Sequence, residues 1–248
     1  MKMIISNYTI SNTLKVLLFT VFIFSINSYC NSTDEKLNVI WISCEDMGPV
    51  LGTYGVKEIS TPNIDKLAEE GIKYTNAYST VGVCAPSRFS IITGMYPARL
   101  GAHNMRTGSF YTYKDPDKLT YKQNKGVVDK SGVNVPEYEV VTPSNIKAFT
   151  EYLRDENYYC INNNKCDYQF NSPFTAWDEV SGNISYNDRP ENTPFFYVKN
   201  LMVTHESRIW LRKNEPITVD KNILKIPAYY PDIPEVRNDI AIKYSNIQ

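Results

Sequence analysis

The sequence predicts an α/β fold in which a mostly parallel sheet is flanked by helices. Two apolar runs, residues 37–44 and 195–203, are rich in β-branched and aromatic residues, which is typical of strands covered on both faces. Between them, helical spacing alternates with short strand-like segments, and no repeat or low-complexity tract interrupts the alternation. At 248 residues the chain can form one large domain or two small ones with a substantial core.

The first 30 residues predict a signal peptide. Lys2 and Lys15 precede an apolar run over residues 16–24, and small and polar residues follow it up to Cys30. The run is short for a bilayer span, although an N-terminal membrane anchor is the alternative. Cys30 stands where a bacterial lipoprotein would be lipidated. We therefore expect an exported protein that is periplasmic, extracellular or lipid-anchored at the cell surface.

Charge and cysteine content exclude several protein classes. The 26 basic and 27 acidic residues nearly cancel, and no basic stripe occurs, so we expect no nucleic-acid partner. The 5 cysteines are an odd number and cannot all pair, which excludes a small disulfide scaffold. Cys160 and Cys166 are the nearest candidates for the disulfide that export would permit.

Further elements are expected in order along the chain. A helix over residues 61–71 begins at Thr-Pro and ends at Gly71, where the C-terminal cap favours glycine. Residues 107–141 lack a clear period and predict a long surface loop that faces substrate. The chain stops inside its last predicted helix without a cap, so we expect an incomplete architecture. The remaining predictions are strands at 72–78 and 158–161 and helices at 87–93, 143–153 and 235–248.

The most specific motif is Val-Cys-Ala-Pro-Ser-Arg-Phe-Ser-Ile-Ile-Thr-Gly at residues 83–94. Pro86 suits the first turn of a helix, so the side chain of Cys84 is expected beside a helix N-terminus. The free N–H groups and the dipole there favour an anionic group. The alternative is that Cys84 is an ordinary small residue of the core.

This motif resembles the sulfatase signature, and the resemblance runs from about Asn38 to the end of the chain. It implies an alkaline phosphatase-like fold, with residues 37–248 as the N-terminal part of the catalytic domain. It also implies that Cys84 is converted to formylglycine by a formylglycine-generating or anaerobic sulfatase-maturating enzyme. The hydrated aldehyde would then be the nucleophile that attacks sulfur.

Two acidic residues, Glu45 and Asp46, directly follow the first predicted strand. Ligands gather beyond the carboxyl ends of strands in open α/β sheets, and hard cations prefer oxygen ligands. The resemblance implies that both residues and modified Cys84 bind a divalent cation, commonly Ca²⁺. Most family members have Asp-Asp here, and Glu45 is one methylene longer. An exposed acidic turn is the alternative.

Three further residues are candidates for catalysis. Arg88 can hold the aldehyde hydrate or a sulfate oxygen bidentately. The resemblance implies that Lys165 contacts sulfate, with Asp167 where many sulfatases have His. His205 follows the second apolar run, and imidazole suits protonation of the leaving oxygen. The other histidine, His103, is expected in a loop near the pocket.

The function expected from these residues is hydrolysis of sulfuric esters of carbohydrates. The sequence resembles a bacterial sulfamidase or heparan-sulfatase-like branch, which implies sulfated glycans such as glycosaminoglycans as substrates, with N-sulfoglucosamine as one candidate. Two alternatives remain open. One is a phosphatase or phosphonate hydrolase of the same superfamily, and the other is an inactive fragment that binds ligand.

Overall fold

The computed structural model describes residues 35–105, 128–134, 138, 140–170 and 173–248. The predicted signal peptide, Cys30 and most of the 107–141 loop therefore lie outside the described residues. The chain divides into two compact units, residues 1–37 and 38–248, and the helices and strands of the described residues belong to the second. Within the described residues, no helix combines the length and apolarity that a membrane crossing requires.

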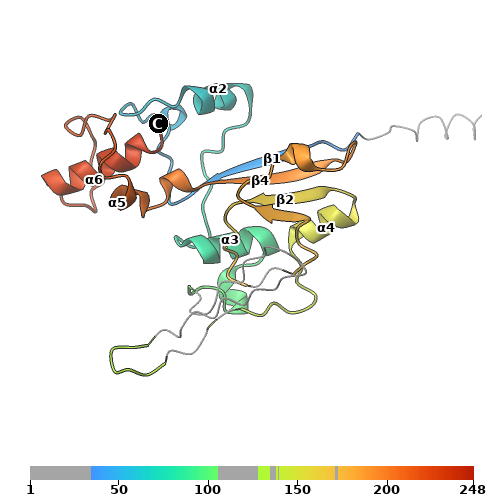
Figure 1. Ribbon diagram of the computed structural model, residues 1–248. Helices are drawn as coiled ribbons and strands as arrows, with labels where there is room; N and C mark the ends of the chain where they lie inside the picture. The colour runs from blue at the N-terminus through green and yellow to red at the C-terminus, as the bar shows by residue number, and fades with distance from the viewer. Residues whose placement is uncertain (1–34, 106–127, 135–137, 139, 171–172) are drawn as a thin grey trace, which may run out of the picture. The chain divides into compact units, whose positions relative to one another are not determined.

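The second unit is built on four parallel strands in the order β1-β4-β2-β3 (Figure 1). Val39 lies opposite Phe196 on one side of β4, and Tyr159 lies opposite Phe195 on the other. Because all four strands run the same way, their carboxyl ends meet at one edge of the sheet. The strands are β1 (Val39–Cys44), β2 (Tyr159–Asn163), β3 (Glu179–Ser181) and β4 (Phe195–Leu201).

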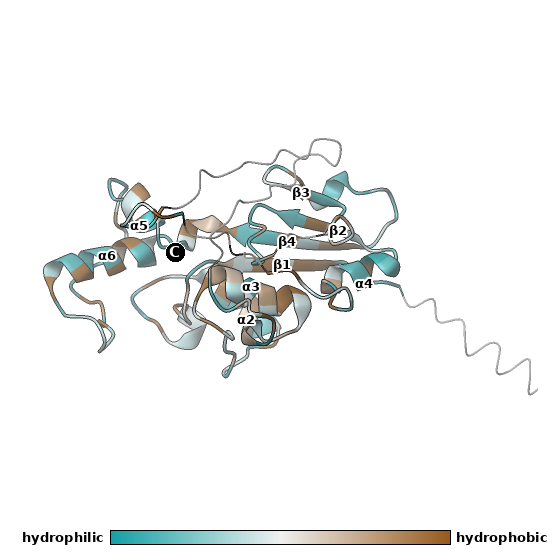
Figure 2. Ribbon diagram, turned by 90° about the horizontal axis from the view of Figure 1, so that it is seen from below, coloured by the Kyte–Doolittle hydropathy of each residue, from teal (hydrophilic) through white to brown (hydrophobic). Residues whose placement is uncertain are grey.

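Two helices, α3 (Cys84–Thr93) and α4 (Phe149–Asp155), cover one face of this sheet (Figures 1 and 2). Side chains alternate between the faces of a strand, so Phe196 and Val198 of β4 join Phe89 of α3 in the main core. On the other face, the ring of Tyr186 stacks on Phe195 at 5.1 Å. Tyr186 begins η3 (Tyr186–Asp188), a single 3₁₀ turn.

The remaining helical segments are η1 (Gly52–Tyr54), α2 (Pro62–Glu70), η2 (Pro97–Leu100), η4 (Met202–Thr204), α5 (Arg208–Leu211) and α6 (Pro234–Ser245). A separate core cluster forms where α6 contributes Ala241 beside Ile59, Val219 and Leu224.

Most of the predicted elements are confirmed. The strands at 37–44, 158–161 and 195–203 correspond to β1, β2 and β4, and the helices at 61–71, 87–93 and 235–248 to α2, α3 and α6. Gly94 ends α3 with φ 69°, a left-handed conformation that glycine adopts without strain. The predicted helix at 143–153 begins later, at Phe149. Ala148 is its N-cap residue, and the N–H of Ala148 donates to the side chain of Glu151 in the first turn.

Two expectations are wrong. Residues 72–78 form no strand, although their polarity alternates, since no neighbouring strand pairs with this exposed described segment. Residues 39–42 of β1 are not covered on both faces: Ile40 is 52% and Ile42 60% exposed. Trp41 stacks on Phe149 of α4, so the alternating Ile40 and Ile42 lie on the opposite face, which is exposed along this edge strand.

The four described cysteines, Cys44, Cys84, Cys160 and Cys166, are free thiols. The Cys160–Cys166 disulfide is therefore not formed. Cys160 is buried in the main core, and its Sγ is 3.7 Å from the carbonyl oxygen of Thr150.

Replacing Phe89 by alanine should lower the free energy of unfolding by about 3–5 kcal/mol, because the change opens a cavity at a fully buried position. Ile91, on the same helix but 47% exposed, is the matched control, and Ile91→Ala should cost about 1 kcal/mol or less. Urea denaturation measures both. Equal losses in the two variants would contradict the assignment of Phe89 to the main core.

Candidate active site

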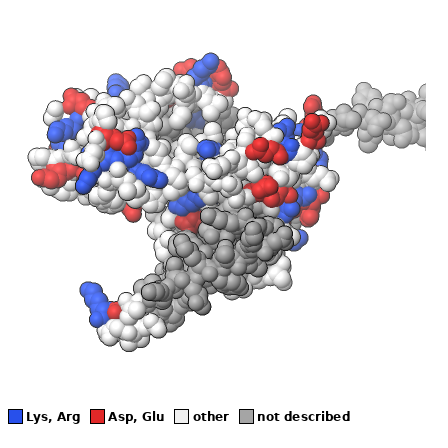
Figure 3. All heavy atoms as spheres, viewed as in Figure 1, with Lys and Arg blue, Asp and Glu red and all other residues white. Residues whose placement is uncertain are grey.

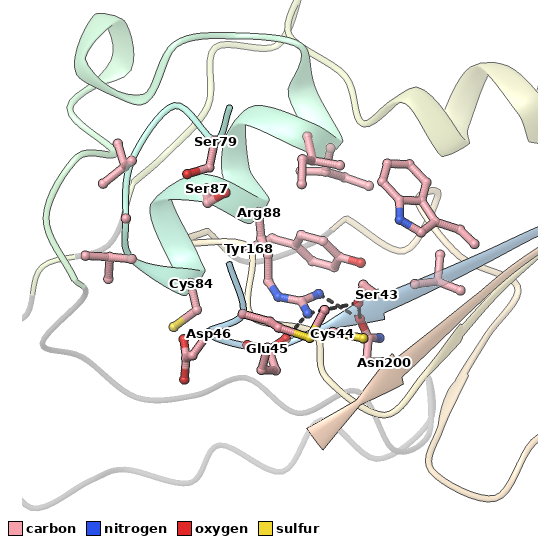
Figure 4. A pocket seen from close by; sticks show the side chains of 18 of the residues that line it. Ser43, Cys44, Glu45, Asp46, Ser79, Cys84, Ser87, Arg88, Tyr168 and Asn200 are labelled. Carbon is pink, nitrogen blue, oxygen red and sulfur yellow. Dashed lines mark hydrogen bonds and ion pairs between the residues drawn. The ribbon is translucent and has the colours of Figure 1, made fainter. Parts of the chain in front are cut away.

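A pocket of about 540 Å³ opens between α3 and the carboxyl ends of β1 and β4 (Figure 4). Its polar lining comes from segments that are far apart in the sequence, and it includes Ser43, Glu45, Asp46, Cys84, Arg88 and Asn200. Trp41, Ile91 and Phe149 line its apolar part. The structure thus brings together most of the residues that the sequence singled out.

Cys84 is the first residue of α3 and is partly buried in the pocket wall. Val83 caps the helix in an extended conformation without a side-chain hydrogen bond. Pro86 lies in the first turn, and the N–H of Ala85 hydrogen-bonds to the sulfur of Cys84. Cys84 therefore lies at a helix N-terminus, as predicted. This position suits an anionic group.

The surroundings of Cys84 raise the pKa of its thiol above the ordinary value. Burial raises the pKa of the thiol, and the charge of Asp167 and a hydrogen bond to it raise the pKa further. Lys165 and the N–H of Ala85 act in the opposite direction but do not reverse the shift. An unmodified Cys84 is consequently a weak nucleophile near neutral pH, because the thiolate is the reactive form.

Arg88 lies one helical turn after Cys84, on the same face of α3. Its guanidinium donates to Asn200 Oδ1 at 2.8 Å, to Ser43 Oγ at 3.4 Å and to Glu45 Oε1. Figure 4 shows these contacts as dashed lines running from the helix to the ends of the strands. The contacts fix the plane of the guanidinium, which a lysine ammonium in its place could not reproduce.

Lys165 reaches the same carboxylate from the segment after β2. Its Nζ is 2.7 Å from Glu45 Oε2 and 3.5 Å from Asp167 Oδ2. The side chains of Glu45, Arg88 and Lys165 are 3%, 11% and 12% exposed. Removing one partner of so buried a pair typically costs about 3–5 kcal/mol, since the other charge is left without compensation.

Sequence reasoning missed a group of amides that supports this cluster. Asn200 Nδ2 donates to the carbonyl oxygens of Asn163, at 2.8 Å, and Lys165, at 3.3 Å. Tyr168 Oη donates to Asn162 Oδ1 at 2.8 Å. The signal was present: asparagine interrupts the apolar strands at their carboxyl ends, where a buried polar group requires partners.

His205 joins the site through Asp46. His205 Nε2 is 3.8 Å from Asp46 Oδ2, and Nδ1 is 3.0 Å from Ser207 Oγ. Asp46 Oδ2 also accepts the N–H of Glu206 at 2.9 Å. The 204–206 segment is thereby attached to the end of β1. His103, in contrast, is an exposed loop residue outside the pocket lining.

The described residues do not fit a complete divalent-cation site. Among them, no group of three or more His, Cys, Asp or Glu side chains is arranged to hold a metal ion. Calcium takes about 6–8 oxygen ligands, and both carboxylate oxygens of Glu45 already accept from cationic side chains. Asp46, with its side chain 33% exposed, is the better oriented of the two acids for a cation.

Comparisons with known proteins find a matching family and individual relatives of this chain. The sequence model of the sulfatase family matches residues 37–232. An ulvan-active sulfatase of Formosa agariphila is 44% identical over 176 residues, which are 71% of this chain and 26% of that protein. Human iduronate 2-sulfatase is 48% identical over 67 residues, 27% of this chain and 12% of the relative. The chain thus spans 26% or less of the length of these two relatives.

A solved protein of Bacteroides thetaiotaomicron, from work on its metabolism of multiple glycosaminoglycans, is similar in structure. The TM-score is 0.51 at 15% sequence identity, over 86% of this chain and 55% of that one. At this identity the likeness concerns the fold alone. It confirms the expected α/β class of alkaline phosphatase-like type.

The raised pKa of the Cys84 thiol predicts slow alkylation of the unmodified protein at pH 8. Because burial and Asp167 both raise the pKa, Asp167→Asn should speed the reaction of Cys84 with iodoacetamide. Lys165 lowers the pKa, so Lys165→Met should slow it. Mass spectrometry of the peptide that contains residue 84 separates this thiol from the others. If both substitutions changed the alkylation rate of Cys84 in the same direction, Asp167 and Lys165 would not have opposite effects on the pKa of the thiol.

Proposed function

Since the chain belongs to the sulfatase family, we propose that it hydrolyses sulfuric esters, with position 84 supplying the nucleophile. The observation that carries the proposal is the convergence of Arg88 and Lys165 beside Cys84 at the N-terminus of α3. Two partly buried cations and a helix N-terminus are suited to a sulfate group, whose negative charge is spread over several oxygens.

Arg88 and Lys165 would bind and neutralise the sulfate oxygens as charge develops on them. The contacts of Arg88 with Asn200 and Ser43 hold the guanidinium before substrate arrives, so little reorganisation accompanies binding. On the described surface in Figure 3, basic and acidic side chains are interspersed. Recognition of an anionic substrate would therefore depend on these two residues rather than on a charged face.

His205 would protonate or stabilise the leaving oxygen. Its Nδ1 contact with Ser207 Oγ and the nearby carboxylate of Asp46 orient the imidazole ring. A general acid must lie within hydrogen-bond reach of the group that it protonates, and apo geometries are often longer than those in complexes. We therefore assign His205 to the leaving-group side of the pocket.

The sulfatase family generally uses a formylglycine and a divalent cation. We infer that Cys84 is the residue converted, which needs a formylglycine-generating or anaerobic sulfatase-maturating enzyme. The modified residue would supply a hydroxyl nucleophile in place of the protonated thiol. We assign Asp46 as the carboxylate in the described chain that would contact the cation, with calcium as the expected ion.

Sulfated carbohydrate is the proposed substrate class, because one relative is named an ulvan-active sulfatase and another an N-acetylgalactosamine-6-O-sulfatase. The predicted signal peptide supports export, with Cys30 as the proposed lipid anchor. The comparisons do not favour a phosphatase: sulfatases are the relatives that they name. Hydrolysis of paired aryl sulfate and aryl phosphate, followed by ulvan and glycosaminoglycan oligosaccharides, tests the reaction and the substrate class.

Cys84→Ala should lower sulfate-ester hydrolysis by at least about 10⁴-fold, because the precursor of the nucleophile is lost. The test uses protein from a host that has the maturation enzyme, and mass spectrometry should show the thiol of residue 84 replaced by an aldehyde. Cys160→Ala, in the core, is the control that removes a different thiol. Full activity in Cys84→Ala would refute the assignment. Unmodified Cys84 with no hydrolysis would favour an inactive, ligand-binding protein.

Arg88→Lys should lower kcat/KM by about 10²-fold although the charge is kept, because the ammonium cannot make the fixed contacts with Asn200, Ser43 and Glu45. The control is Arg237→Lys, at an exposed pair with Asp232. Steady-state kinetics on one sulfate ester compares the variants. A rate for Arg88→Lys equal to that of the control would show that charge alone is sufficient.

A further inference from the structure

Glu45 is the least exposed acidic group of the site, and its environment differs from that of a metal ligand. The side chain is 3% exposed, and the side chains of its two partners, Arg88 and Lys165, are 11% and 12% exposed. An isolated carboxylate would be costly to bury there, so its burial depends on these two cations. Position 45 is nevertheless the first of the two acids that the family resemblance assigns to a cation.

Both oxygens of the Glu45 carboxylate are engaged by different cations. Oε1 accepts from Arg88, and Oε2 accepts from Lys165 at 2.7 Å. The backbone is held as well, because the N–H of Glu45 donates to Thr204 Oγ1 at 2.8 Å. A metal ion at Glu45 would share each carboxylate oxygen with a cationic side chain, whose positive charge opposes that of the metal.

The neighbouring acid, Asp46, has a different environment. Its side chain is 33% exposed, and its Oδ2 accepts a backbone N–H from Glu206 and lies near His205 rather than near Lys165 or Arg88. Asp46 adopts φ 47°, a left-handed conformation that turns the chain directly after Glu45. Two consecutive carboxylates are thus directed to different groups, one to a buried cation pair and one to the exposed side of the pocket.

The length of the Glu45 side chain explains how it reaches both cations. Arg88 comes from α3 and Lys165 from the segment after β2, and the carboxylate lies between them. An aspartate at this position would be one methylene shorter. Glutamate therefore suits the bridging of two cations from separate elements.

We propose that Glu45 is a positioning residue whose carboxylate holds Arg88 and Lys165 together as an anion-binding pair and is not a ligand of the cation that Asp46 binds. The proposal rests on the proposed function, since the anion held by the pair is the sulfate group of the substrate. Arginine has five N–H donors and lysine three, which is more than the contacts with Glu45, Asn200, Ser43 and Asp167 use. A sulfate can therefore bind the pair, and it competes with Glu45 for positive charge.

The test measures ion binding by the full chain without turnover. Thermal unfolding of the wild type, Glu45→Gln and Asp46→Asn is followed against increasing inorganic sulfate and, separately, increasing CaCl₂. Without added sulfate, Glu45→Gln should have a lower Tm, because two buried cations lose their shared counterion. Added sulfate should restore it, with a sulfate Kd about tenfold lower than that of the wild type.

The calcium titration distinguishes an acidic residue that binds the cation from one that positions Arg88 and Lys165. Glu45→Gln should respond to calcium as the wild type does, whereas Asp46→Asn should lose the response. If Glu45→Gln loses the calcium response as Asp46→Asn does, Glu45 is a ligand and the proposal is wrong. If calcium shifts none of the proteins, the sulfate comparison decides.

Glu45→Asp is the second variant, in case Glu45→Gln does not fold. It keeps the charge but shortens the reach, so it should leave one cation unpaired and bind sulfate more tightly than the wild type. Equal sulfate affinities in the wild type and in the folded variants would overturn the proposal. Failure of the proposed function has a different signature: absent hydrolysis and an unmodified Cys84 leave these ion titrations unchanged.

Discussion

The carboxylate of Glu45 connects three segments that are far apart in the sequence. It lies directly after β1, accepts from Arg88 on α3 and accepts from Lys165 after β2. Because the group is buried, its negative charge depends on the two cations for compensation, and it in turn offsets the repulsion between them. Together with Phe89 in the main core, this interaction links α3, and with it Cys84, to the sheet.

The parallel sheet explains why such a cluster forms at this edge. Strands β1, β2 and β4 run in the same direction, so Ser43, Asn162 and Asn200 lie near their carboxyl ends and face α3. Buried amides require hydrogen-bond partners, and here they bind one another, the guanidinium of Arg88 and backbone carbonyls. The polar groups at the ends of the strands thus also orient Arg88, which lines the pocket.

The apolar content of a strand did not predict whether both of its faces are buried. Residues 39–42 of β1 and residues 195–198 of β4 are similarly apolar, yet those of β1 are largely exposed and those of β4 are buried. Tyr186 packs on Phe195 and Tyr197 on the second face of β4, whereas Ile40 and Ile42 on that face of the edge strand β1 are exposed. Alternating polarity at 72–78 failed as a strand signal for a related reason, since a strand requires a partner to accept its hydrogen bonds.

By itself the sequence determined the α/β class, the three main strands, and α3 with Cys84 at its start, because these depend on local patterns of polarity and on Pro86 and Gly94. It also singled out Glu45, Arg88, Lys165 and His205 by their neighbours in the chain. Only the tertiary structure decided which of them touch: Glu45 pairs with two cations, while Asp46 faces His205. Such pairings follow from the register of the sheet and the placement of α3 on it, which no local pattern encodes.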